Sequence, residues 1–142
     1  MAQMKVELSN FDTWAQSIHP SIKNDPLWEF KVYPKALFIS DLAWKDCDYL
    51  LKDSRGRAVA NQLTRSAGSI SANIEEGFGR GFGKDYAYKL KIALGEARET
   101  RGWYLRGRAL LPEKILDHRL SLLTEIISIL PSSIKTQRNY KR

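Results

Sequence analysis

The feature that most constrains this 142-residue chain is an uninterrupted seam of apolar and small residues near its middle. The members of the seam are spaced alternately four and three residues apart: Tyr86, Leu90, Ala93, Ala97, Thr100, Tyr104, Gly107 and Leu111. At about 100° per residue of α-helix, these positions stay within an arc of roughly 100°. The spacing therefore predicts a long amphipathic helix over residues 84–110.

Three further helices are predicted, over residues 34–52, 54–76 and 113–130. Their limits follow from residues that start, cap or end helices: Pro34, Asp53 or Ser54, Gly77, Pro112 and Pro131. No segment is typical of a strand, and the connections are short. The expected fold is all-α, an up-down-up-down antiparallel four-helix bundle over residues 27–130.

Two shorter segments flank the predicted bundle. Residues 1–26 are expected to form a lead-in with a short helix, capped by Asn10, with Phe11, Trp14 and Ile18 on one face. The tail, residues 131–142, has four basic residues and no acidic one. Such a tail is consistent with either solubility or polyanion binding.

More apolar stripes are present than a monomeric bundle needs, so self-association into a cyclic homo-oligomer is expected. The last helix, for example, has one seam through Leu116, Leu120, Leu123, Ile127 and Leu130 and a second through Ile115, Leu122, Ile126 and Ile129. The residues expected at the subunit interface are Ile92, Trp103, Leu110, Ile115 and Leu122.

Several function classes are disfavoured by what the sequence lacks. The single cysteine, Cys47, excludes an internal disulfide or a multi-cysteine zinc site and is expected to be buried. His19 and His118 lie in no recognisable catalytic or metal motif, and the glycine-rich connector 77–83 neither follows a strand nor precedes Gly-Lys-Ser/Thr. We expect no enzyme activity, metal or cofactor. No secretory signal or membrane span is visible, which favours the cytoplasm.

Positive charge is concentrated along the chain. The net charge is +7 and the isoelectric point about 9.6, and residues 77–111 contain eight basic against three acidic groups. Most of these cations lie opposite the central seam, so phosphate contacts are expected from Arg80, Lys84, Lys91, Arg98, Arg101 and Arg108. The alternative is a solvated surface that Glu96 and Glu99 offset.

A second group of polar residues lies on the helix over 54–76. Asn73 and Glu76, beside Arg65 and Arg80, form either a polar site or a set of ties between the helix end and its neighbours. The same stretch resembles the bacterial four-helix bundle family named for proteins encoded in 23S ribosomal RNA intervening sequences. The family pattern is matched at Arg65, Ala67, Ser69, Ile70, Asn73, Ile74, Glu76, Gly77 and Arg80, although Glu75 replaces a usually small residue.

A second motif strengthens the resemblance, because residues 92–99 follow the family's I-A-x-G-x-A-x-E helix and end at Glu99. The likeness extends over about residues 28–130. The family includes accessory variability proteins of diversity-generating retroelements, which are basic pentamers that bind nucleic acid. The resemblance therefore implies a homopentamer that binds RNA or DNA and works with a reverse transcriptase.

Two functions remain in competition. The first is a non-catalytic nucleic-acid-binding accessory protein, based on the basic arc, the tail and the resemblance. The second is a protein-interaction scaffold whose basic face docks an acidic protein partner without binding nucleic acid. A bundle that encloses a small ligand is a weaker option, because no inward polar cluster is visible.

Overall fold

The computed structural model describes residues 10–141, which are helical and contain no strand. Four long helices make up the body of the molecule: α3 (Val32–Leu50), α4 (Ser54–Gly79), α5 (Lys84–Arg106) and α6 (Glu113–Arg138). Short elements precede α3 and follow α5: α1 (Phe11–Gln16), α2 (Pro20–Lys23), η1 (Pro26–Glu29) and η2 (Arg108–Leu110). The predicted all-helical class and the four long helices are confirmed.

Helix starts follow the predicted capping chemistry. Asn10 Oδ1 accepts the backbone N–H of Thr13 at 3.1 Å, and Asp53 Oδ1 accepts that of Arg55 at 2.8 Å. Pro34 lies in the first turn of α3, where a backbone N–H has no helical partner, although the helix begins at Val32. Each cap supplies an acceptor for a backbone donor that the helix itself cannot pair.

The last helix runs further than predicted. It passes through Pro131 and ends at Arg138, so the prediction that Pro131 stops it is wrong, and residues 131–138 of the expected tail are helical. A proline inside a helix costs about 3 kcal/mol. Leu130 and Ile134 on either side are buried, and burying such a side chain is worth about 1.5–3 kcal/mol, which offsets the cost.

The prediction that Gly77 ends the second helix is also wrong, because α4 continues to Gly79. Gly77 instead permits close packing, since a Cβ there would lie 2.8 Å from both Tyr86 Cδ1 and Lys89 Cβ of α5. The left-handed glycines are Gly81 (φ 87°) and Gly83 (φ 114°), in the connector between α4 and α5. The chain turns there, after α4 has ended.

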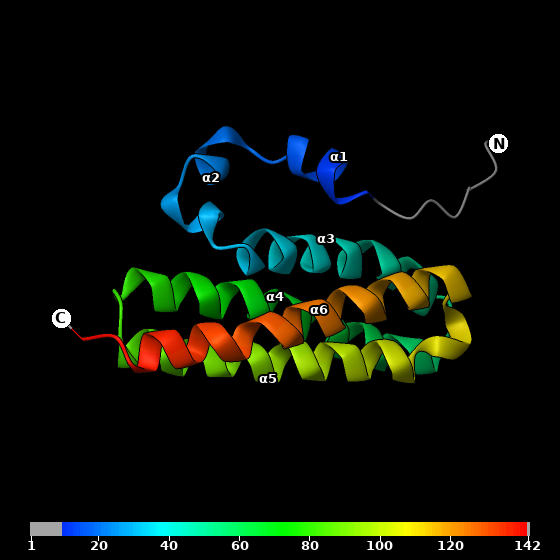
Figure 1. Cartoon of the computed structure of the whole chain (residues 1–142). Coiled ribbons are helices and arrows are strands. Elements are labelled where there is room, and N and C mark those ends of the chain that lie inside the picture. Colours follow the sequence, from blue (N-terminus) through cyan, green and yellow to red (C-terminus); the bar gives the residue numbers. More distant parts are fainter. Residues whose placement is uncertain (1–9, 142) are drawn as a thin grey trace.

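The core lies between the four long helices, which run side by side in Figure 1. Every member of the predicted central seam is buried, from Tyr86 to Leu111. The third predicted helix ends earlier than expected, however, at Arg106 rather than 110. Gly107 follows it, where a Cβ would lie 2.9 Å from Leu50 Cδ2.

The lead-in packs along α3 (Figure 1). The rings of Phe11 and Trp14 lie 5.5 and 5.0 Å from that of Phe38, and Trp14 Nε1 donates to Asp41 Oδ2 at 2.8 Å. The predicted short helix is therefore confirmed with Phe11 and Trp14 on one face, but it ends at Gln16, so the prediction that Ile18 shares this face is wrong. Residues 1–9 of the expected lead-in lie outside the described residues.

Candidate nucleic-acid interface

One side of α5 faces solvent and is rich in positive charge. Its exposed members, which we call the α5 outer face, are Lys84, Tyr88, Lys91, Arg98 and Leu105. Within residues 10–141, the cations of this face form no ion pair. At 1.5 Å per residue, the face is about 30 Å long.

The other residues predicted to contact phosphate lie outside the α5 outer face. Arg101 is half-buried, and its guanidinium donates to Thr124 Oγ1 on α6 at 3.2 Å. Arg80 caps the end of α4 and pairs with Glu76 at 2.8 Å. Arg108 lies beyond the end of α5, in η2, so the prediction that it continues the helical arc is wrong.

The motif residues divide into two clusters on α4. Arg65 and Arg80 lie fifteen positions apart, about 22 Å along the helix, so no single polar site contains both. At the far end, Glu76 bonds to Lys89 of α5 at 3.2 Å as well as to Arg80, and these cations hold the pKa of Glu76 below its ordinary value. Glu76 therefore links α4 to α5.

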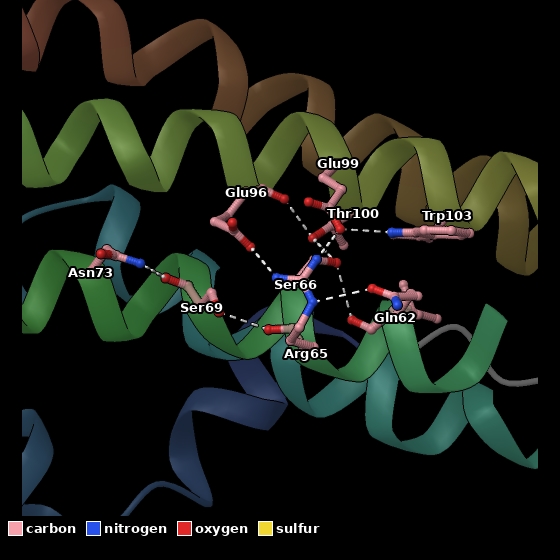
Figure 2. A network of polar contacts seen from close by, with 10 residues as sticks. Gln62, Arg65, Ser66, Ser69, Asn73, Glu96, Glu99, Thr100 and Trp103 are labelled. Carbon is pink, nitrogen blue, oxygen red and sulfur yellow. Dashed lines mark hydrogen bonds and ion pairs between the residues drawn. The ribbon is translucent and has the colours of Figure 1, made fainter. Parts of the chain in front are cut away.

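Arg65 is the centre of the second cluster, which Figure 2 shows between α4 and α5. Its guanidinium donates to Gln62 Oε1 at 3.2 Å, to Glu96 Oε2 at 3.3 Å and to Glu99 Oε2. Glu99 Oε2 also accepts from Trp103 Nε1 at 2.8 Å. Glu96 and Glu99 are thus engaged with Arg65 rather than turned toward the cations of the α5 outer face.

The remaining motif residues bond within their own helix. Ser69 Oγ donates to Arg65 O at 2.9 Å, and Asn73 Nδ2 donates to Ser69 O at 2.7 Å (Figure 2). Beneath them, the Ser66 and Thr100 hydroxyl oxygens lie 2.9 Å apart and join the two helices inside the core. Among the motif residues, Arg65 and Glu76 therefore tie α4 to α5, whereas Ser69 and Asn73 bond only within α4.

The residues predicted at a subunit interface do not form a uniform surface. Ile115 is buried within this chain, so its predicted exposure to a neighbouring subunit is wrong. Ile92, Trp103, Leu110 and Leu122 are half-buried. Arg106 lies over the Trp103 ring, 4.9 Å from its centroid. Among residues 10–141, the large apolar side chains most exposed to solvent are Trp44 at 73% and Tyr88 at 62%, and neither was predicted at an interface.

A buried ionic cluster joins α3, α5 and α6. Arg119 Nε and Nη2 donate to the two oxygens of Asp46 at 2.7 and 3.0 Å, and Tyr104 donates its hydroxyl to Asp46 at 2.7 Å. Arg119 Nη1 lies 2.8 Å from His118 Nδ1. Burial and the carboxylate of Asp46 raise the pKa of Tyr104 well above its ordinary value.

Sequence reasoning missed this cluster, although a signal was present. On α3, Ile39, Ala43 and Asp46 are spaced four and three residues apart, as expected of one buried helix face. On α6, Arg119 lies four residues from both Ile115 and Leu123. A charge at a core position on each of two helices is the pattern expected of a buried pair.

Two negative findings apply to the described part of the chain. Among residues 10–141, no group of three or more histidine, cysteine or acidic side chains is placed to hold a metal ion. None of the helices described there combines the length and apolarity needed to cross a bilayer.

Comparison with known proteins relates the chain to a protein family and to a solved structure. The model of the family described as 23S rRNA-intervening sequence protein matches residues 29–132. A solved structure from Bacteroides thetaiotaomicron, described as a protein with unknown function from the S23 ribosomal protein family, is 32% identical with a TM-score of 0.67. The alignment covers 74% of this chain and 99% of that one. Among curated protein sequences, none matches the chain.

Proposed function

The chain belongs to the 23S rRNA-intervening sequence protein family, and we propose from this premise that it is a non-catalytic protein that binds nucleic acid through the α5 outer face. The single observation on which the proposal rests is the row formed by Lys84, Lys91 and Arg98, exposed and without ion pairs among residues 10–141. Cations of this kind release counterions when they contact phosphates, which supplies affinity without sequence preference.

The acidic residues of α5 support this choice over a neutralised surface. Glu96 and Glu99 bond to Arg65, and Glu99 also accepts from Trp103. The α5 outer face therefore keeps its positive potential. Tyr88 lies between Lys84 and Lys91 and exposes most of its ring, so the face combines phosphate contacts with an aromatic surface.

The family resemblance extends the proposal to partners and assembly. We propose an up-down-up-down bundle that assembles into a cyclic homopentamer, acts in the cytoplasm and assists a retroelement reverse transcriptase. In such a ring the α5 outer face is repeated by symmetry, so that several weak phosphate contacts act together. Short connections between the long helices support the up-down order.

A second candidate is a scaffold that docks an acidic protein partner on the same face. Leu105, half exposed at the end of the α5 outer face, favours it, because an apolar contact beside cations is typical of a protein interface. The two functions differ in their response to salt. Binding to phosphates weakens steeply as salt rises, whereas an interface with an apolar centre weakens less.

Fluorescence anisotropy titrations test the proposal. They use labelled DNA and RNA, each single-stranded and duplex, at salt concentrations between about 50 and 200 mM. Wild type is expected to bind all four, and Lys91→Glu/Arg98→Glu to weaken all four together and flatten the salt dependence. Lys45→Glu/Arg57→Glu makes the same change of charge on exposed residues of α3 and α4 and is the matched control. If wild type binds none of the four at low salt, the scaffold function replaces the proposal.

A further inference from the structure

The end of the bundle where α4 turns into α5 contains a pocket. Its cavity of about 400 Å³ lies between η1, the connector after α4, the start of α5 and the last turns of α6. This volume is within the range of about 300–1,000 Å³ that small-molecule sites occupy. Figure 1 shows the C-terminal end of α6 beside this connector.

Aromatic rings form the apolar wall of the pocket. Phe78 lies edge-on to Phe82 and to Tyr86, with ring centroids 6.5 and 6.1 Å apart, and Phe30 meets Tyr86 at 6.4 Å. Phe82 also contacts Tyr140, at 5.4 Å, and both of these rings are about half exposed. Tyr86 is buried, which raises the pKa of its hydroxyl to about 12. Aromatic rings therefore supply much of the apolar lining that an occupant would meet.

The rest of the pocket lining is mainly polar. It contains the carboxylate of Glu29 and the side chains of Ser132, Ser133, Thr136 and Gln137 on α6. Gln137 Oε1 accepts the backbone N–H of Gly83 at 3.0 Å, which leaves its amide hydrogens to donate elsewhere. A carboxylate that accepts and an amide that donates suit the edge of a nucleobase, since the exocyclic amino group of cytosine donates to Glu and the N7 atom of a purine accepts a hydrogen bond.

Positive charge surrounds this end of the molecule. The exposed cations here belong to the connector, the first turn of α5 and the end of the chain: Arg80, Lys84, Lys135, Arg138 and Lys141. Exposed carboxylates lie at the same end: Glu29 in the pocket lining, Asp85 in the first turn of α5, and Glu75 and Glu76 near the end of α4, of which Glu76 pairs with Arg80. Lys84, the first residue of the α5 outer face, follows Phe82 of the pocket lining by two positions in the chain.

We propose that this pocket receives an unpaired nucleobase, whose phosphates continue onto the α5 outer face, so that the protein prefers single-stranded to duplex nucleic acid. The inference rests on the proposed function. A base in a duplex has both faces stacked and its edge paired, so it cannot enter, whereas an unpaired base offers both a ring face and a free edge. Phe82, with the Tyr140 ring packed against it, stacks on the base, and Glu29 and Gln137 bond to its edge.

The first measurement compares a labelled 12-nucleotide DNA strand of mixed sequence with its duplex at one salt concentration. Wild type is expected to bind the strand about tenfold more tightly. Phe82→Ala/Tyr140→Ala is expected to bring strand affinity down to that of the duplex and to leave duplex affinity unchanged. Trp44→Ala removes a more exposed aromatic ring from α3 and is the matched control that keeps the preference.

A second measurement reports the base itself. A single 2-aminopurine in the strand is expected to lose fluorescence on binding to wild type and to Phe82→Trp, because stacking on a ring quenches it. Phe82 lies in the connector between α4 and α5, so Phe82→Ala alone gives the same comparison if the double variant has reduced helix content.

The outcomes separate the two proposals. Equal affinity of wild type for strand and duplex, with both lost in Lys91→Glu/Arg98→Glu, overturns the pocket and leaves the proposed function standing. An unchanged strand preference in Phe82→Ala/Tyr140→Ala also overturns the pocket. Absence of binding to either form at low salt overturns both.

Discussion

Arg119 on α6 donates two hydrogen bonds to Asp46 on α3, and both side chains are almost completely buried. Tyr104 of α5 donates to the same carboxylate, so three of the four long helices meet at one charge pair. Removing water from two charges is costly, and the pair is stable only because hydrogen bonds satisfy its polar atoms. The consequence is that loss of one member is far more damaging than loss of both charges.

Arg119→Met is accordingly expected to lower the free energy of unfolding by about 3–5 kcal/mol, because it leaves Asp46 charged, buried and without its cation. In Asp46→Asn/Arg119→Met no buried charge remains, and the amide oxygen of asparagine still accepts from Tyr104. The double variant is expected to cost less than the sum of the two single variants by at least about 1 kcal/mol. Urea unfolding of the four proteins measures this difference, and simple additivity would contradict it.

The central seam could be predicted because helical spacing is a local property. Each member from Tyr86 to Leu111 is buried as expected. This burial could be predicted without knowing which helices pack against the seam. The last helix was harder, since apolar residues lie on two of its faces. The first predicted seam is buried at Leu123, Ile127 and Leu130 but only half-buried at Leu116 and Leu120, where Ile115 and Arg119 are buried instead. Which of two apolar faces becomes buried depends on where α3 lies, and the sequence of α6 alone does not show this.

Sites made by two helices were predictable only in part. The basic residues of the α5 outer face share one helix, and their spacing alone brings them together. The pairing of Arg65 with Glu99 depends on the relative height of α4 and α5, which spacing within one helix does not determine. Gly77 was misread for the same reason: the contact that requires a glycine comes from Tyr86, on another helix.

Stability is expected to depend on His118 below neutral pH. Burial and the charge of Arg119 lower the pKa of His118, so the unfolded chain binds this proton at a higher pH than the folded one does. Above the pKa of His118 in the unfolded chain, about 6.5, the histidine is neutral in both states and does not lower the free energy of unfolding. As the pH falls through that value the unfolded chain takes up the proton first, and the free energy of unfolding falls. His118→Gln, which retains an acceptor for Arg119, is expected to lose less stability between pH 8 and pH 5.5 than wild type in urea unfolding. Equal losses in the two proteins would contradict the assignment.

Two glycines are expected to respond in opposite directions to the same substitution. Gly77→Ala places a Cβ 2.8 Å from Tyr86 and from the Cβ of Lys89 and is expected to destabilise the protein. Gly95 lies inside α5 with nothing within 4 Å of an added Cβ, so Gly95→Ala is expected to stabilise by about 0.5–1 kcal/mol. Thermal unfolding of both variants tests the pair. A gain in stability for Gly77→Ala would show that α4 and α5 can move apart at no cost.

Self-association is the last expectation, and it follows from the half-buried stripe of Ile92, Trp103 and Leu110 on the flank of α5 and in η2. Light scattering at micromolar concentration is expected to give a mass well above the 16.3 kDa of one chain. Trp103→Glu is expected to weaken the assembly most, since it replaces a large apolar contact by a charge beside Glu99, to which the indole N–H now donates. Trp44→Glu makes the same exchange on the outer surface of α3 and is expected to have the smaller effect. A wild-type mass equal to that of one chain would refute the assembly. A larger fall in assembly mass for Trp44→Glu than for Trp103→Glu would place the interface on α3 rather than on α5.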